Sequence, residues 1–274
     1  MTTTPPLVEL ADGFTIHTPS EREARFIYNE IYADHCYDVP NLPSSPFIID
    51  AGANIGLFTL YYKQKFPSAT ILAFEPAPQT YSTLLRNLRL HGLADDPRIS
   101  TFRSGLGERE AAAATFTYYP NAPGNSTLFP DQKDGLKQLV ASKFPEHGQQ
   151  VIDAWLGKEE VVEVEVQRLS HFLLELESRK GRSEEEEQGG GLKVESIDLL
   201  KIDVEGAEFE VLAGLDEEHW PLVKNVVLEI TTVGNEGAVE RMRALLEQKG
   251  FVVTVEAAHP DWSEVIVLVK GTRA

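Results

Sequence analysis

The most constraining stretch of this sequence is FIIDAGANIG, residues 47–56. Three successive apolar residues at 47–49 predict a short strand that is buried on both faces. Gly52 and Gly56 then supply a tight turn, and the apolar spacing that follows over 57–66 is helical. A strand–turn–helix unit of this kind leaves backbone N–H groups at the helix N-terminus facing a bound ligand.

A second strand is predicted at residues 69–74, and it ends in Glu75, 19 positions after Gly56. In nucleotide-binding α/β units, an acid at about this interval accepts hydrogen bonds from ribose hydroxyls. The glycine turn and the acid together predict a site for an adenosine-containing cofactor.

Two residues near the turn indicate which cofactor. Asn54 occupies the middle position, where a nicotinamide fingerprint has a glycine that lies against the pyrophosphate. Asp50, at the end of the predicted strand, would repel a pyrophosphate but could bind the ammonium group of an amino-acid-bearing nucleoside, directly or through water. We therefore expect S-adenosylmethionine as the cofactor, with an NAD(P)-dependent oxidoreductase as an alternative.

Three motifs occur in order: Asp50-x-Gly52-x-Asn54-x-Gly56, then Phe74-Glu75-Pro76, then LKIDVEGAE at 200–208. In this order they resemble the FkbM-type family of S-adenosylmethionine-dependent methyltransferases, over roughly residues 20–270. The resemblance implies a Rossmann-like class I methyltransferase fold, with a mostly parallel seven-stranded sheet, helices on both faces and an antiparallel final strand. In that family the end of the third strand, here Ser104, lies beside the adenine ring. The expected cofactor-binding residues are Asp50, Gly52, Asn54, Gly56, Glu75, Pro76, Ser104 and Asp203.

Length and composition fit one large α/β domain, because 274 residues can bury a substantial core. We expect residues 1–46 to be a lead-in with a helix and a cleft-covering loop, and residues 47–274 to be the cofactor-binding domain. A lid-like insertion is expected at about 117–158. Residues 177–191, rich in acids and glycines, are expected to form a solvated, flexible loop without chemistry.

The net charge of the chain restricts the classes of partner that it is suited to bind. With 25 Lys and Arg against 43 Asp and Glu, the formal charge is −18, which does not suit binding to nucleic acid or to anionic membranes. The first residues lack the features of a signal peptide, and no run approaches a membrane span. Cys36 is the only cysteine, which suits a reducing compartment. We expect a cytoplasmic protein that acts on a small molecule.

Several segments outside the motifs could contribute to a site. A helix with a Ser20–Glu23 capping box is predicted first, and in the following loop His35 could accept a proton and Tyr37 could form a wall. The alternative is a capping histidine and a packed tyrosine. The long polar and aromatic loop at 118–130 is interpreted as a substrate cover or, alternatively, as an ordered surface loop. Its candidate contacts with the acceptor are Tyr118, Tyr119, Asn125 and Ser126. After a helix at about 132–144, an alternating strand at 160–167 is predicted as a half-exposed edge.

Acidic residues follow two further predicted strands. Asp203 ends the strand at 197–202 and Glu229 lies near the end of the strand at 225–230, so both should lie on the ligand-binding rim of a parallel sheet. Glu205 is a further candidate contact for the acceptor. The alternative is that Asp203 caps the N-terminus of the following helix and that Glu205 interacts favourably with the dipole of that helix. Many FkbM-like sequences carry a histidine and an aspartate after this glutamate, whereas this chain has Thr231-Thr232.

Methyl transfer to a hydroxyl is an in-line displacement that needs alignment and removal of one proton. The candidate proton acceptors are Asp203, Glu229 and His35, in that order. We therefore predict an O-methyltransferase that acts on a hydroxyl of a small natural product or sugar-like acceptor. An N-methyltransferase, a Mg²⁺-assisted version and a non-catalytic module that binds S-adenosylmethionine stay open as alternatives.

Overall fold

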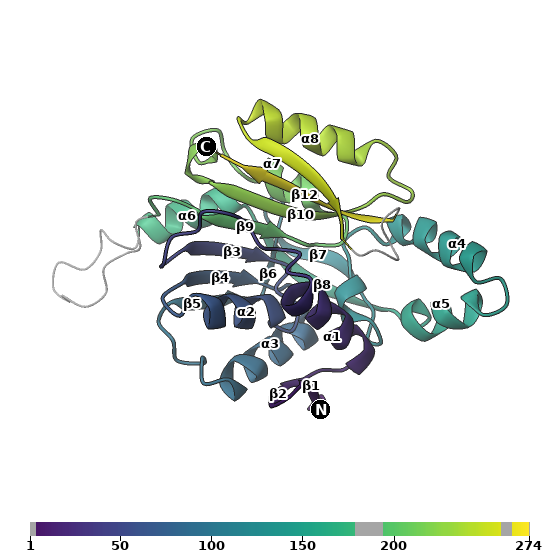
Figure 1. The fold of residues 1–274 in the computed structure, drawn as a ribbon. Helices are drawn as coiled ribbons and strands as arrows, with labels where there is room; N and C mark the ends of the chain where they lie inside the picture. Colours follow the sequence, from purple (N-terminus) through teal and green to yellow (C-terminus); the bar gives the residue numbers. More distant parts are fainter. Residues whose placement is uncertain (1–3, 179–193, 259–264, 274) are drawn as a thin grey trace.

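The computed structural model describes residues 4–178, 194–258 and 265–273, and a seven-stranded sheet forms its centre (Figure 1). From one edge to the other, the strands are β11 (Val252–Ala257), β12 (Ile266–Thr272), β10 (Asn225–Thr231), β9 (Leu199–Ile202), β3 (Phe47–Ala51), β4 (Thr70–Phe74) and β5 (Ile99–Phe102). Strand β12 runs antiparallel to both of its neighbours, whereas β10, β9, β3, β4 and β5 are mutually parallel. The predicted fold class and its antiparallel final strand are confirmed.

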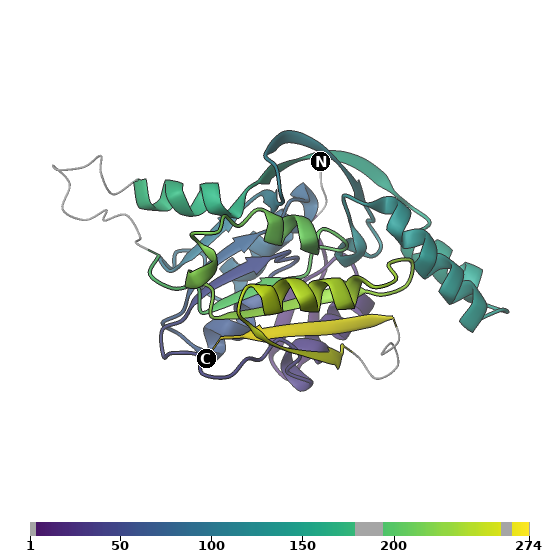
Figure 2. The ribbon, with the colours of Figure 1, turned by 90° about the horizontal axis from the view of Figure 1, so that it is seen from above.

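Helices cover both faces of this sheet, as its apolar strands require. On one face lie α1 (Glu21–Tyr28), the π-helix η1 (Asn29–Ala33), α2 (Leu57–Lys65) and α3 (Pro78–Leu90). On the other face lie α6 (Leu169–Ser178), α7 (Glu208–Ala213) and α8 (Ala238–Gln248). Because successive side chains of a strand point to opposite faces, Ile48 packs in the first core and Ile49 in the second. Figure 2 shows the sheet between these two layers.

A second, three-stranded sheet has the order β6-β8-β7, formed by β6 (Ser104–Leu106), β8 (Glu160–Gln167) and β7 (Ala111–Tyr118). The prediction that residues 160–167 form an edge strand is wrong, because β8 pairs with β6 on one side and β7 on the other. The alternation in β8 does mark a buried and an exposed face: Val164 is buried and Glu165 is exposed. Alternation reports which faces are buried and not how many neighbours a strand has.

The segment between β7 and β8 contains more structure than predicted. It holds the short helical turns η2 (Pro123–Asn125) and η3 (Pro130–Gln132), followed by helices α4 (Lys133–Lys143) and α5 (Gly148–Leu156). Helix α4 was predicted and α5 was not. The two helices pack together and project from the body of the protein in both views (Figures 1 and 2).

The N-terminal lead-in forms a hairpin of β1 (Leu7–Ala11) and β2 (Phe14–His17). The predicted capping box at the start of α1 is wrong, because Ser20 makes no side-chain capping hydrogen bond and Glu23 instead accepts one from the Gly124 N–H at 3.0 Å. Apart from its first two residues, which end α6, the loop predicted at 177–191 lies outside the described residues.

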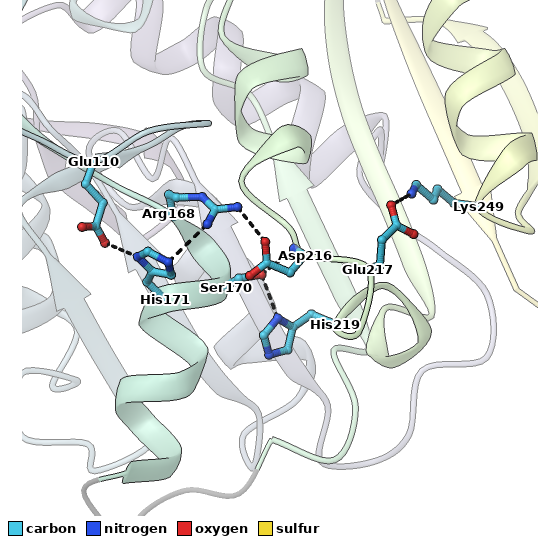
Figure 3. Close-up of polar contacts among 8 residues, drawn as sticks. All are labelled: Glu110, Arg168, Ser170, His171, Asp216, Glu217, His219 and Lys249. Atoms are coloured by element: carbon cyan, nitrogen blue, oxygen red, sulfur yellow. Dashed lines mark hydrogen bonds and ion pairs between the residues drawn. The ribbon is translucent and has the colours of Figure 1, made fainter.

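A polar network joins the start of α6 to the segment between α7 and the short turn η5 (Trp220–Leu222) (Figure 3). The buried Ser170 Oγ accepts a hydrogen bond from the Asp216 N–H at 2.6 Å and lies 2.7 Å from Nδ1 of His219. Arg168 donates to Asp216 at 2.7 Å. The network fixes α6 and the chain leading to β10 on the same face of the sheet.

Candidate active site

The glycine turn after β3 has the backbone that its sequence predicts. Gly52, Asn54 and Gly56 have φ values of 79°, 48° and 95°, in the region that favours glycine. The N–H groups of Gly52 and Ala53 donate to the carbonyl of Phe74 at 3.0 and 2.9 Å. A Cβ on Gly52 would lie 1.8 Å from the backbone oxygen of Asp203, so the turn and the end of β9 are in direct contact.

Two cavities lie side by side at the carboxyl ends of the parallel strands. The glycine-turn cavity, about 60 Å³, is lined by residues that include Gly52, Glu75, Pro76 and Gly105. The carboxylate cavity, about 240 Å³, is lined on its polar side by Glu23, Glu30, Asp203, Glu205 and Glu229. Its apolar side includes Phe26, Ile27, Leu136, Trp155, Val265 and Ile266. Both cavities share Asn54, Gly124, Asp203 and Glu205.

Glu75 lies where the sequence places it, at the end of β4 and in the wall of the glycine-turn cavity. Its carboxylate accepts hydrogen bonds from the N–H groups of Asn54 and Ala77, at 3.0 and 2.9 Å. Burial raises the pKa of Glu75 to about 7, against the lowering effect of these two hydrogen bonds. Pro76 packs against Gly105 on the same side.

Asp50 has a different role from the one expected. Its carboxylate is fully buried, lies 3.2 Å from Nζ of Lys201 and accepts a hydrogen bond from Thr59 at 2.9 Å. Asp50 is absent from the lining of both cavities, so its charge faces Lys201 and not a ligand. Burial alone would lower the pKa of Lys201, but Asp50 and Asp203 outweigh it and raise that pKa. Lys201 also donates to the carbonyl of Gly52 at 2.6 Å, which ties the buried pair to the turn.

Asp203 and Glu229 come together as predicted, and both line the carboxylate cavity. The hydroxyl of Tyr37 donates to Oδ2 of Asp203 at 3.1 Å and lies 3.5 Å from Oε2 of Glu229. Burial, followed by the neighbouring Asp203 and Glu30, raises the pKa of Glu229 well above its usual value. Tyr37 therefore contacts the two candidate proton acceptors, and it is not among the residues that line either cavity.

Two further glutamates of the carboxylate cavity were not predicted. Glu30 lies on the π-helix η1 and is buried. Glu23 lies on α1, the helix that directly precedes η1. Burial raises the pKa of each to about 8. A signal was present in the sequence, because Glu23, Ile27 and Glu30 have the i, i+4, i+7 spacing of one helix face.

Glu205 and Asn125, both candidate acceptor contacts, line the carboxylate cavity. Glu205, at a φ of 56°, forms an ion pair with Lys133, which also lies 3.4 Å from the side-chain oxygen of Asn125. Sequence reasoning missed Lys133, because a lysine at a helix start carries no distinctive signal.

Other predicted residues lie elsewhere. Tyr118 and Tyr119 are buried and line neither cavity, so the structure does not place them as acceptor contacts. Ser126 lines the glycine-turn cavity and accepts a hydrogen bond from the Tyr119 N–H at 3.0 Å. Ser104 is buried behind that cavity, next to Gly105, which lines it.

His35 is not positioned as a proton acceptor for either cavity. Its Nδ1 lies 2.9 Å from the hydroxyl of Tyr61 and 3.8 Å from Asp38, its side chain is 54% exposed, and it lines neither cavity. Its backbone has a φ of 53°, and its ring contacts Tyr61 on α2. The interpretation of His35 as a structural histidine fits the observed contacts.

Within residues 4–178, 194–258 and 265–273, no three His, Cys, Asp or Glu side chains are gathered in a way that could hold a metal ion. Asp203, Glu205 and Glu229 thus do not form such a group. In the same ranges, no helix combines the length and apolar character needed to cross a bilayer.

The strand order, the antiparallel β12 within the sheet and the glycine turn after β3 define a class I methyltransferase fold. The chain belongs to the FkbM methyltransferase family, since residues 50–253 match the model of the methyltransferase FkbM domain. It is therefore an S-adenosylmethionine-dependent methyltransferase, as its motifs predicted.

Three relatives cover nearly the whole chain. Methyltransferase sdnD from Sordaria araneosa is 48% identical over 96% of this chain and 94% of its own length. Methyltransferase 1 from Beauveria bassiana is 42% identical over 93% and 92%, respectively. The 31-O-demethyl-FK506 methyltransferase FkbM from Streptomyces tacrolimicus is 33% identical over 91% and 90%.

Proposed function

We propose that this protein transfers the methyl group of S-adenosylmethionine to a hydroxyl group of a small natural product or sugar-like acceptor. The observation that carries the proposal is that two cavities with different linings meet at Asp203. The name of the Streptomyces relative, a 31-O-demethyl-FK506 methyltransferase, specifies an oxygen as its methyl acceptor and supports the same choice here.

The residues of the glycine-turn cavity fit the cofactor. Asn54 lines this cavity, and its buried Oδ1 has no hydrogen-bond partner among the described residues, so it is available to a polar ligand; the buried Ser104 Oγ, next to Gly105 of the lining, also has none. Gly52 and Asn54 would approach the amino-acid portion, Glu75 would accept hydrogen bonds from the ribose, and Ser104 with Gly105 would lie beside the adenine. When bound, S-adenosylmethionine supplies an electrophilic methyl group on a positively charged sulfur.

The carboxylate cavity fits the acceptor. Its apolar wall, which includes Phe26 and Trp155, can bury a hydrophobic body, while its carboxylates can accept hydrogen bonds from hydroxyl groups. Lys133 is engaged by Glu205, so the cavity does not favour an anionic group near the reactive end.

The proton of the acceptor hydroxyl needs a base within hydrogen-bond reach. No histidine is found among the described residues that line the carboxylate cavity, and Thr231 lines it at the position after Glu229 and Ile230. Among the described lining residues, the carboxylates are therefore the candidate bases. Asp203 and Glu205 line both cavities, but Glu205 is paired with Lys133, whereas the side chain of Asp203 is 31% exposed, so we assign the proton to Asp203. Such general-base assistance contributes about 10²–10⁴-fold in rate.

The proposal is tested by measuring S-adenosylhomocysteine formation with small alcohols and deoxysugars and with matched amines. We expect hydroxyl acceptors to be turned over, and Asp203→Asn to lower kcat by about 10²-fold or more. Asp95→Asn, an exposed carboxylate away from both cavities, is the matched control. Preferential methylation of the amines would replace the O-methyltransferase with an N-methyltransferase. If calorimetry detected binding of a dinucleotide to the protein but no binding of S-adenosylmethionine, the proposal would be overturned altogether.

A further inference from the structure

Tyr37 lies between the two candidate proton acceptors. Its ring is buried, with an edge-to-face contact to Phe58 at a centroid distance of 5.7 Å, and Nζ of Lys201 lies 5.7 Å from its centroid. Its backbone carbonyl accepts a hydrogen bond from Tyr62 at 2.9 Å. Packing on several sides therefore fixes the phenol oxygen at 3.1 Å from Asp203 and 3.5 Å from Glu229.

The number of protons available to Tyr37, Asp203 and Glu229 restricts the charge states of these three groups. A phenol carries one proton, so Tyr37 can donate to only one of the two carboxylates, and Asp203 is the nearer. Glu229 can then interact favourably with the phenol oxygen only if Glu229 is itself protonated and donates. The surroundings favour a neutral Glu229, because it is buried among other acids. The charged and titratable groups that face Asp203 and Glu229 are Lys201 and Asp50 from the sheet, Glu30 and Cys36 from the segment before β3, and Glu205 and Glu208 from the segment after β9.

We propose that Tyr37 is a positioning residue that keeps Asp203 ionised and Glu229 protonated, so that Asp203 is the carboxylate that takes the acceptor's proton. This assignment rests on the proposed function. The proton released from the acceptor hydroxyl passes to an oxygen of Asp203, which becomes a neutral carboxyl, and no further reactant is required. Glu229 keeps its own proton throughout, and Tyr37 does not touch the acceptor.

The discrimination between two forms of the cofactor tests this assignment without knowledge of the acceptor. S-adenosylmethionine and S-adenosylhomocysteine differ by the methyl group and the positive charge on sulfur, so the ratio of their Kd values reports how the site responds to that charge. An ionised Asp203 should favour the charged ligand. At about pH 7 we therefore expect Asp203→Asn to lower the preference for S-adenosylmethionine, measured by calorimetry, by about tenfold.

Tyr37→Phe removes the hydrogen bond donated to the ionised Asp203. Because this hydrogen bond favours the charged form of the carboxyl, we expect the preference for S-adenosylmethionine to fall by about threefold or more at the same pH, in the same direction as in Asp203→Asn. Tyr81→Phe is the matched control, because its hydroxyl contacts Thr101 and it lines neither cavity, and its Kd ratio should equal that of the native protein. A loss of packing alone would weaken both ligands without changing the ratio.

A second variant keeps the test decisive if Tyr37→Phe does not fold. Glu229→Gln retains a side-chain donor and no charge, as a protonated glutamate does, so its Kd ratio should match the native one. A preference for S-adenosylmethionine that fell by about tenfold in this variant would show that Glu229 is normally ionised and would overturn the assignment. An unchanged ratio in folded Tyr37→Phe would do the same while leaving the proposed function intact. If neither ligand binds the native protein, the proposed function itself fails.

Discussion

Replacing Gly52 with alanine tests the contact between the glycine turn and the end of β9. Gly52 has a φ of 79°, which an L-residue adopts at a cost of about 1–2 kcal/mol. The added Cβ would also lie 1.8 Å from the backbone oxygen of Asp203 and 2.9 Å from its backbone carbon. Because both atoms belong to backbone, a side-chain rotation cannot relieve the overlap.

The magnitude follows from these two contributions. Overpacking in a closely packed site costs about 1–3 kcal/mol, so together with the backbone term we expect Gly52→Ala to lose about 2–5 kcal/mol of unfolding free energy. For a chain of this size, that loss lowers Tm by roughly 5–15 °C. The relief of the overlap must move Asp203 or the turn, so affinity for S-adenosylmethionine should fall at least about tenfold.

Differential scanning calorimetry and ligand titration measure both effects. Gly92→Ala is the matched control, because Gly92 also has a positive φ of 71° but an added Cβ would meet nothing within 4 Å. It should lose only the backbone contribution and bind the cofactor normally. If Gly52→Ala lost no more stability than Gly92→Ala and bound S-adenosylmethionine with native affinity, the contact described here would not have the importance assigned to it.

Three further predictions concern buried polar groups. Lys201→Met leaves Asp50 without its cation and should cost about 3–5 kcal/mol in chemical denaturation, with part of the loss recovered when Asp50→Asn is added. Ser170→Ala removes the partner of two buried groups and should cost about 1–3 kcal/mol while S-adenosylmethionine affinity stays unchanged. In the folded protein the pKa values of Glu23 and Glu30 are about 8, against 4.5 for an ordinary glutamate. Between these two pH values the folded state therefore holds protons that the unfolded state has released. The Tm of the ligand-free protein should therefore fall as pH rises from about 5 to about 8, and Glu30→Gln should flatten that fall; a Tm that rises over this interval would contradict the burial of these acids.

The central unit was predictable because it depends on local signals. The apolar run before Gly52, the two glycines and Glu75 at the end of the next strand each constrain backbone or burial by themselves. The fold class and its antiparallel final strand were predicted from the family resemblance that these motifs carry. In this way the sequence identified Gly52, Asn54, Glu75 and Pro76 in the wall of the glycine-turn cavity, but not most of the other residues that line it.

The remaining parts of the site depend on long-range contacts that sequence spacing does not encode. In the sequence, Lys201 is a single polar residue in an otherwise apolar strand. Only the parallel pairing of β9 with β3 places it opposite Asp50. Glu23 has the spacing of a capping residue, but the loop carrying Gly124 offers it a backbone N–H instead. Glu30 shares the spacing of one helix face with Glu23 and Ile27, but nothing in the sequence indicates the change from α1 to a π-helix or the cavity that this face borders.

The segment around Gly124 has a consequence for the order of events in catalysis. The same short stretch of backbone borders both cavities, and Glu23 anchors it from α1. The glycine-turn cavity, at about 60 Å³, is far smaller than the roughly 300 Å³ or more of typical ligand sites, so we expect its lining to shift when a nucleoside enters, at the stretch around Gly124 that separates it from the carboxylate cavity. While this stretch is displaced, the carboxylate cavity lacks one of its walls. We therefore expect sequential kinetics in which the nucleoside arrives first and leaves last, with turnover limited by the reopening of this stretch.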